Sequence, residues 1–263
     1  MGSTVSVEID AHVAHVTLNR PDKMNAVSLE MFAELGAVGD RIAADPAVRV
    51  VVLCGAGDNF CAGIDTAIFE AEAGGIDASA MAPQAPSPAN VFQRAAYVWR
   101  EVPVPVLCSI HGVAFGAGMQ IALGADMRYA APDARFSIME AKWGIIPDMA
   151  ISTTARNVVA LDRIKELAFT ARVVAAEEAL GLGLITHVHK EPLVAARATA
   201  DEIAGRSPSA VRAIKQLFVT GWNAPDAESL ALEARLQMGL LGGENQREAV
   251  LAVMEKRVPN FND

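Results

Sequence analysis

The sequence predicts an α/β body that reaches to about Pro192, followed by a helical region. Continuous apolar segments at 48–54 and 106–110 are typical of strands buried on both faces, and helical apolar periods separate them. Beyond Pro192 strand patterns stop. With 263 residues, 52% of them hydrophobic, the chain can form one large core with a helical appendage. We place the boundary between 1–195 and 196–263.

The first 110 residues predict alternating strands and helices. Residues 5–9 and 13–18 alternate apolar and polar side chains, which predicts two strands joined by a tight turn. Ser28 is a suitable N-cap for a helix that ends before Pro46. Residues 71–90 are rich in Ala, Gly, Pro and Ser, which predicts a mobile loop or lid. The other expected elements are a strand over 48–54, a glycine-bearing loop over 55–65, a helix over 91–100 and a strand over 106–110.

Helical patterns dominate the second half of the chain. The expected helices cover 119–123, 150–160, 162–170, 175–181, 208–218, 226–241 and 244–256, with one short strand over 185–188. The last helices carry apolar faces that need something to pack against, and we expect subunit contacts to cover them.

Charge and composition exclude several functional classes. A net charge of −9 argues against binding to nucleic acid or to an anionic membrane. No apolar run approaches the ~20 residues that span a bilayer, and no signal peptide is visible, so we expect a cytoplasmic protein. The three cysteines show no metal-ligand spacing, and no GxGxxG motif is present. We therefore expect neither a metal nor a nicotinamide cofactor.

The stretch over 111–148 carries the features that indicate an enzyme. A glycine cluster over 112–118 leads into the helical segment 119–123, and small residues before a helix let backbone N–H groups approach a ligand closely. Two carboxylates, Glu140 and Asp148, follow in apolar surroundings. Backbone donors beside an isolated carboxylate suit chemistry on a polarised carbonyl.

Five short segments carry recognisable motifs, in one order along nearly the whole chain. They are LNRP…MNA over 18–26, FCAGID over 60–65, 110–118, 136–147, and MEKR…NF over 254–261. This ordered set resembles the crotonase, or enoyl-CoA hydratase/isomerase, superfamily. The resemblance implies a ClpP/crotonase-like spiral of ββα units with a helical C-terminal trimerisation region. It also implies an acyl-CoA thioester substrate, no cofactor beyond the coenzyme A of that substrate, and a homotrimer or a dimer of trimers.

The same resemblance assigns an oxyanion hole and a coenzyme A site. The backbone N–H groups of Ile64 and Ala117 would hold the thioester oxygen, and each such donor is typically worth ~2.7–4 kcal/mol in the transition state. Ala117 departs from the usual glycine but keeps its N–H. The other implied substrate contacts are Lys23, Met24, Ala26, Ala62, Gly63, Asp65, Gly116, Trp143 and, from a neighbouring subunit, Lys256.

The carboxylates decide which reaction the resemblance favours. Hydratases of the family use two glutamates, whose positions match Gln120 and Glu140, so one acid–base group is missing here. Dienoyl-CoA isomerases carry acidic groups at the positions of Gln120, Glu140 and Asp148, of which this chain retains two. We therefore expect a double-bond isomerase, with a hydratase as the alternative and a non-catalytic acyl-CoA-binding protein as the third possibility. Apolar neighbours such as Met139 and Trp143 predict a raised pKa for Glu140.

Several of these residues have a structural role as an alternative. Glu140 has Lys142 as a nearby ion-pair candidate, and Asp148 is well placed to cap the next helix. Asp65 is expected to order its own loop, and Lys256 to cap a helix C-terminus. Gln120 is either an orienting group or inert filler.

A nucleophilic enzyme is the remaining alternative. Cys61 and Ser137 are available, but neither has a histidine close in sequence, and no G-x-S-x-G motif exists. His111 is expected to make structural hydrogen bonds at a strand end.

Overall fold

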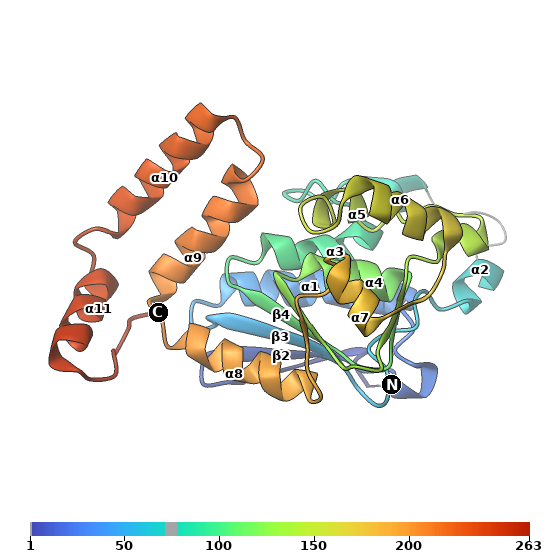
Figure 1. Ribbon diagram of the computed structural model, residues 1–263, viewed down its shortest axis with the longest axis horizontal. Helices are drawn as coiled ribbons and strands as arrows, with labels where there is room; N and C mark the ends of the chain where they lie inside the picture. Colours follow the sequence, from blue (N-terminus) through green and yellow to red (C-terminus); the bar gives the residue numbers. More distant parts are fainter. Residues whose placement is uncertain (1, 72–77) are drawn as a thin grey trace.

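The computed structural model describes residues 2–71 and 78–263 of the chain (Figure 1). Within these residues, the main sheet has six strands in the order β1-β2-β3-β4-β6-β9, and a second sheet has three in the order β5-β7-β8. β1 and β2 form the predicted antiparallel hairpin, and the other neighbours in the main sheet are parallel. The strands are β1 (Val5–Asp10), β2 (Val13–Leu18), β3 (Val50–Gly55), β4 (Val106–Ile110), β5 (Val113–Phe115), β6 (Met127–Ala130), β7 (Arg135–Ser137), β8 (Val174–Ala175) and β9 (His187–Val188).

Helices cover both faces of the main sheet, with α8 on one face and α1, α3 and α4 on the other (Figure 1). The helices are α1 (Leu29–Ala44), α2 (Ala67–Ala71), α3 (Val91–Glu101), α4 (Ala117–Gly124), α5 (Ile151–Thr154), α6 (Leu161–Thr170), α7 (Ala176–Gly181), α8 (Pro192–Ala204), α9 (Pro208–Gln216), α10 (Asp226–Leu240) and α11 (Glu244–Glu255). Three 3-10 helices are η1 (Pro21–Lys23), η2 (Ala78–Met81) and η3 (Glu140–Trp143), and a π-helical turn spans Leu217–Gly221.

Strand β3 shows why its sequence is apolar at every position. Successive side chains of a strand point to opposite faces, so both faces of β3 meet a helical layer. Val51 and Leu53 belong to the core under α1, α3 and α4, whereas Val50 and Val52 pack with the alanine face of α8. The predicted burial on both faces is confirmed.

The chain alternates between the two sheets in the region that forms the site. β4 lies in the main sheet, β5 lies in the second sheet, and α4 follows; β6 and β7 repeat the same step. The sequence did not indicate β5, β6 and β7, because strands of three or four residues are too short to show a period of two.

Local signals located most of the helices. Ser28 caps α1 as predicted, because its hydroxyl accepts the N–H of Met31 at 3.2 Å. The expected helix over 150–160 is wrong in extent, since only Ile151–Thr154 is helical. Of the predicted loop over 71–90, residues 72–77 lie outside the described part of the chain, and η2 occupies Ala78–Met81.

The C-terminal region extends away from the sheet as α9, α10 and α11 (Figure 1). The boundary predicted at 195/196 falls inside α8, which packs on the sheet, so the extension itself begins with α9. Among its exposed apolar side chains are Met238, Val253 and Met254. Of the residues that the structure describes, no helix is both long and apolar enough to cross a membrane.

The last residues of the chain return to the body beside β3. The buried guanidinium of Arg49 donates to the Asp263 carboxylate at 2.9 Å, to the Phe261 carbonyl at 3.1 Å and to the Ala204 carbonyl at 3.2 Å. These bonds explain why an arginine precedes an otherwise apolar strand.

A buried lysine fastens α9 to the body. The Nζ of Lys215 donates to the carbonyls of Trp99 at 2.9 Å and Val104 at 2.8 Å, and it lies 2.9 Å from the Asp126 carboxylate. Burial lowers the pKa of Lys215, and the charge of Asp126 opposes that shift. Removing this ammonium group leaves the two buried carbonyls without their donor and takes the ion-pair partner from the partly exposed Asp126 carboxylate.

We expect Lys215→Ala to lower the free energy of unfolding by about 1–3 kcal/mol, the usual cost of leaving buried polar groups without their hydrogen-bond donor. Denaturant unfolding at one fixed protomer concentration measures the loss. Exposed Lys190 provides the control, and Lys190→Ala should change stability by less than about 0.5 kcal/mol. Equal stability of the two variants would contradict the role given to Lys215.

Candidate active site

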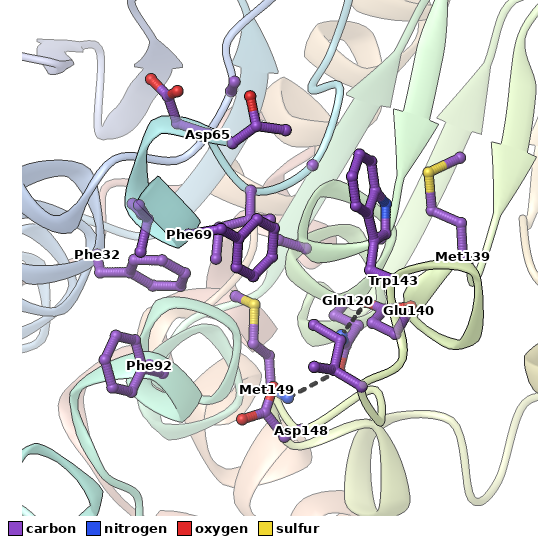
Figure 2. A pocket seen from close by; sticks show the side chains of 18 of the residues that line it. Phe32, Asp65, Phe69, Phe92, Gln120, Met139, Glu140, Trp143, Asp148 and Met149 are labelled. Atoms are coloured by element: carbon purple, nitrogen blue, oxygen red, sulfur yellow. Dashed lines mark hydrogen bonds between the residues drawn. The ribbon is translucent and has the colours of Figure 1, made fainter. Parts of the chain in front are cut away.

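A cavity of about 900 Å³ lies between the 62–66 loop, the start of α4, η3 and the segment 145–149. Figure 2 shows the side chains around it. All the residues predicted for the site line this cavity except Met24 and Lys256. Met24 is half-exposed and follows Lys23, which does line it; Lys256 ends α11 on the extension. The proposed contact of Lys256 across a subunit boundary stays a prediction.

Two residues that line the cavity, Ile64 and Ala117, have backbone N–H groups with no acceptor among the described residues. The Val27 N–H donates to Gly63 at 2.8 Å, and the Asp65 N–H donates to Val27 at 2.9 Å. Val27 and Ile64 thus pair as an isolated parallel β-bridge, in which the N–H of Ile64 points away from Val27. Ala117 is the first residue of α4, so its N–H has no acceptor within the helix. Both N–H groups are therefore free to donate to a bound oxygen, and the helix dipole adds positive potential.

Glycine lets the two segments come together. A Cβ at Gly118 would lie 2.6 Å from the carbonyl oxygen and 2.7 Å from the Cβ of Cys61, so only glycine allows α4 to approach the Cys61 segment this closely. Gly116, with φ of 49°, is the N-cap of α4 in the left-handed region. The position that its Cβ would take lies 3.4 Å from Oε1 of Glu140. The carboxylate therefore lies directly beside the start of α4.

Glu140 is a buried carboxylate with one free oxygen. It lies at the start of η3, and its Oε1 accepts a 2.6 Å hydrogen bond from Nε2 of Gln120. Among the described residues, its buried Oε2 has no hydrogen-bond partner. Burial raises the pKa of Glu140 as predicted; the bond from Gln120 opposes the shift, and the charge of Asp148 adds to it. The alternative role, an ion pair with Lys142, does not fit: Lys142 is exposed whereas Glu140 is buried, and no ion pair joins them among the described residues.

Gln120 holds Glu140 in place. Its side chain is fully buried, and its Oε1 accepts the backbone N–H of Met149 at 2.8 Å. This bond assigns the carbonyl end of the amide, so the NH₂ end must face Glu140. Of the two alternatives for Gln120, the orienting role fits this geometry, and inert filler does not.

Asp148 lies at the rim of the same cavity. Its side chain is exposed, yet enough protein surrounds the carboxyl to raise its pKa. The alternative role as a helix cap is wrong, because the N-cap of α5 is Ala150 and no side chain caps that helix. Asp148 is thus left facing the cavity without a structural task in α5.

The loop residues and the candidate nucleophiles behave as ordinary structural groups. Burial alone would raise the pKa of Asp65, but hydrogen bonds from Ala67 and Arg20 outweigh it and lower the pKa. The expectation that Asp65 orders its own loop is confirmed. His111 bonds the Gly57 carbonyl at 2.7 Å, as expected of a structural histidine.

Neither candidate nucleophile lines the cavity. Burial raises the pKa of the Cys61 thiol to about 12, so the thiol is not ionised at neutral pH. The hydroxyl of Ser137 donates to the Ala171 carbonyl at 3.1 Å. The hydrolase alternative therefore has neither of its two candidate nucleophiles in the cavity.

The sequence did not reveal the apolar wall of the cavity. Phe32 of α1 and Phe92 of α3 line it, together with Phe69 and Met149 (Figure 2). Phe32 and Phe92 lie on the apolar faces of their helices, where a periodicity cannot distinguish a cavity wall from a solid core.

Known proteins resemble this chain in sequence and in fold. The sequence model of the enoyl-CoA hydratase/isomerase family matches residues 8–263. The peroxisomal Delta(3,5)-Delta(2,4)-dienoyl-CoA isomerase of Arabidopsis thaliana is 32% identical over 259 residues, which cover 96% of this chain and 93% of that protein. The (E)-benzylidenesuccinyl-CoA hydratase of Thauera aromatica is 32% identical over 269 residues, covering 98% of each chain. The crystal structure of enoyl-CoA hydratase from Bacillus anthracis is 29% identical, covers 98% of each chain and superposes with a TM-score of 0.87. The predicted fold class is confirmed.

We expect Gly118→Ala to lower the free energy of unfolding by about 1–3 kcal/mol, because the added methyl group overpacks the contact with Cys61. The control is Gly181→Ala at the end of α7, where an added Cβ meets none of the described atoms within 4 Å. That variant should be as stable as the wild type or slightly more so. Denaturant unfolding compares the two, and equal losses would rule out the proposed close contact.

Proposed function

This chain belongs to the enoyl-CoA hydratase/isomerase family, and we propose that it shifts a double bond along the acyl chain of a coenzyme A thioester. Glu140 and Asp148 move the proton, and the backbone of Ile64 and Ala117 holds the thioester oxygen. No metal or redox group takes part in this proposal, and coenzyme A enters as part of the substrate.

The backbone donors make the α carbon acidic. When the thioester oxygen accepts the N–H groups of Ile64 and Ala117, loss of an α proton leaves an enolate whose charge these donors stabilise. Glu140 lies beside Gly116, the residue before Ala117. The Glu140 carboxylate is therefore on the side of the cavity where the α carbon of such a substrate would lie.

Glu140 removes that proton, and a second group returns one further along the chain. The C–H electron pair moves into the conjugated system, the double bond shifts toward the thioester, and a remote carbon takes up a proton. Asp148 lines the same cavity and its raised pKa favours a protonated fraction, which suits it to donate there. One proton leaves and one returns, so no oxidant or water is consumed.

The hydrogen bond from Gln120 to Glu140 is the observation that favours isomerisation over hydration. Addition of water needs one group to hold and deprotonate the water and another to protonate carbon. Gln120 cannot exchange a proton, and its NH₂ group already occupies Oε1 of Glu140 at 2.6 Å. The peroxisomal dienoyl-CoA isomerase of Arabidopsis thaliana supports the same choice. Hydration remains the second candidate, because the relatives from Thauera aromatica and Bacillus anthracis are hydratases by name.

The remaining parts of the proposal concern binding and assembly. Lys23, Ala26, Ala62, Gly63, Asp65, Gly116 and Trp143 form the substrate contacts, with Met24 at the edge and Lys256 supplied by a neighbouring subunit. A homotrimer or dimer of trimers covers the exposed apolar side chains of α10 and α11. The protein acts in the cytoplasm.

We expect Glu140→Gln to reduce double-bond migration in a 3,5-dienoyl-CoA at least about 10²-fold, the usual contribution of a positioned base. The affinity for the thioester should change less than about threefold, since the backbone donors are untouched. Spectrophotometric assays with 3,5-dienoyl-CoA, a 3-enoyl-CoA and crotonyl-CoA measure both reactions. Efficient hydration of crotonyl-CoA by the wild type would favour the hydratase, and thioester binding without any turnover would favour a non-catalytic binding protein.

The stability of the Glu140→Gln variant tests the raised pKa of Glu140. The pKa of Glu140 is raised in the folded protein, so its contribution to stability is fully present below the pKa of the unfolded chain. That contribution is lost as the pH rises through the folded value. At pH 7, Glu140→Gln should therefore be more stable than the wild type, and the difference should vanish at acidic pH.

The pH dependence of turnover tests the role of Gln120. Because Glu140 acts as a base, kcat/KM should fall as the pH drops through its pKa. Gln120→Met removes a donor that stabilises the ionised carboxylate, so the acid limb should move to higher pH. Gln216→Met on the exposed face of α9 is the matched control and should leave the profile unchanged. A profile of Gln120→Met identical to the wild type would rule out this role for Gln120.

A further inference from the structure

We propose that the acyl group taken by this site carries an aromatic ring, which binds against Phe32 and Phe92 at the closed end of the cavity. This inference rests on the proposed function, because it assumes that an acyl-CoA thioester occupies the cavity. It goes beyond that function by naming the chemical class of the acyl group. Three features of the described cavity carry it.

The first feature is the kind of apolar residue that lines the cavity. Elsewhere the core is built largely from Val, Leu and Ala. Among the described residues that line the cavity there is no Leu and no Val; four aromatic and three methionine side chains lie there beside four isoleucines. Aromatic and thioether side chains are those that gain most from contact with another ring. An unbranched alkyl chain needs no such lining.

The second feature is the closed end itself. The rings of Phe32 and Phe92 meet edge to face, with centroids 5.2 Å apart and planes at 85°. Both are buried, and so are Ile68 and Met149 beside them in the wall. A third ring can join such a pair by the same edge-to-face contact, and Met149 adds a thioether to the same wall.

The third feature is the position of this end relative to the acid–base groups. In Figure 2, Phe32 and Phe92 lie across the cavity from Glu140 and Trp143. Trp143 and Phe69 stack at the rim, with centroids 5.9 Å apart, and both are partly exposed. The buried end blocks a long straight chain, which would have to fold back or leave by the rim. An aromatic ring a few bonds beyond the thioester is short enough to end at Phe32 and Phe92.

Binding of two unreactive thioesters tests the inference without relying on turnover. We choose 4-phenylbutanoyl-CoA and decanoyl-CoA, whose acyl groups have the same number of carbon atoms and no double bond to move. Isothermal titration calorimetry of the full chain should give a Kd about tenfold lower for the phenyl compound, the scale of one or two added ring contacts. Equal Kd values, or tighter binding of decanoyl-CoA, would overturn the inference and leave the proposed function intact. If neither thioester binds, the further inference and the proposed function are both contradicted.

A variant locates the preference within the cavity. Phe92→Leu removes one ring of the pair while keeping an apolar side chain of similar bulk, and it should reduce the tenfold preference to about threefold or less. Its affinity for decanoyl-CoA should change little. Phe169→Leu, on the exposed surface of α6, is the matched control and should retain the full preference. A Phe92→Leu protein that keeps the wild-type ratio would place the ring elsewhere and contradict the assignment; if this variant does not fold, the comparison in the wild type still decides.

Discussion

The candidate site depends on one chain of buried hydrogen bonds. The backbone N–H of Met149 bonds Oε1 of Gln120, and Nε2 of Gln120 bonds Oε1 of Glu140. A carboxylate held away from water keeps its charge only where donors compensate for the lost hydration. Here the donor from Gln120, itself oriented by the backbone, offsets only part of the effect of burial, and the pKa of Glu140 stays raised. The second oxygen of Glu140 is left buried and available, which is the property that a proton-transferring group needs.

The glycines place the backbone donors beside that carboxylate. Gly118 lets α4 approach the Cys61 segment, and the N-cap at Gly116 leaves room for Glu140. The two donors then come from segments more than fifty residues apart, Ile64 in a loop after β3 and Ala117 at the start of α4. Rigid backbone donors lose nothing in reorganisation when charge develops opposite them, which is why such a site can be built largely from the main chain.

Much of the site could be predicted, because its residues lie in short ordered motifs. One cavity is lined by Ile64, Ala117, Glu140 and Asp148, although no amphipathic pattern in the sequence predicts that these residues lie together. The Ser28 cap and the hairpin of β1 and β2 followed from local chemistry alone. Closeness in sequence did not decide the two structural alternatives: Lys142 is exposed while Glu140 is buried, and α5 has Ala150 rather than Asp148 as its N-cap.

The sequence by itself determined the α/β body, the helical extension and the residues that can carry a proton, since these depend on periodicity, turn chemistry and side-chain type. Tertiary structure alone decided which way the Gln120 amide points, that the Glu140 carboxylate has one free oxygen, and that Phe32 and Phe92 form a cavity wall. Each of these depends on a partner from a distant element. Such contacts arise only when strands and helices pack, because the orientation of a buried polar or aromatic group is set by its neighbours in space.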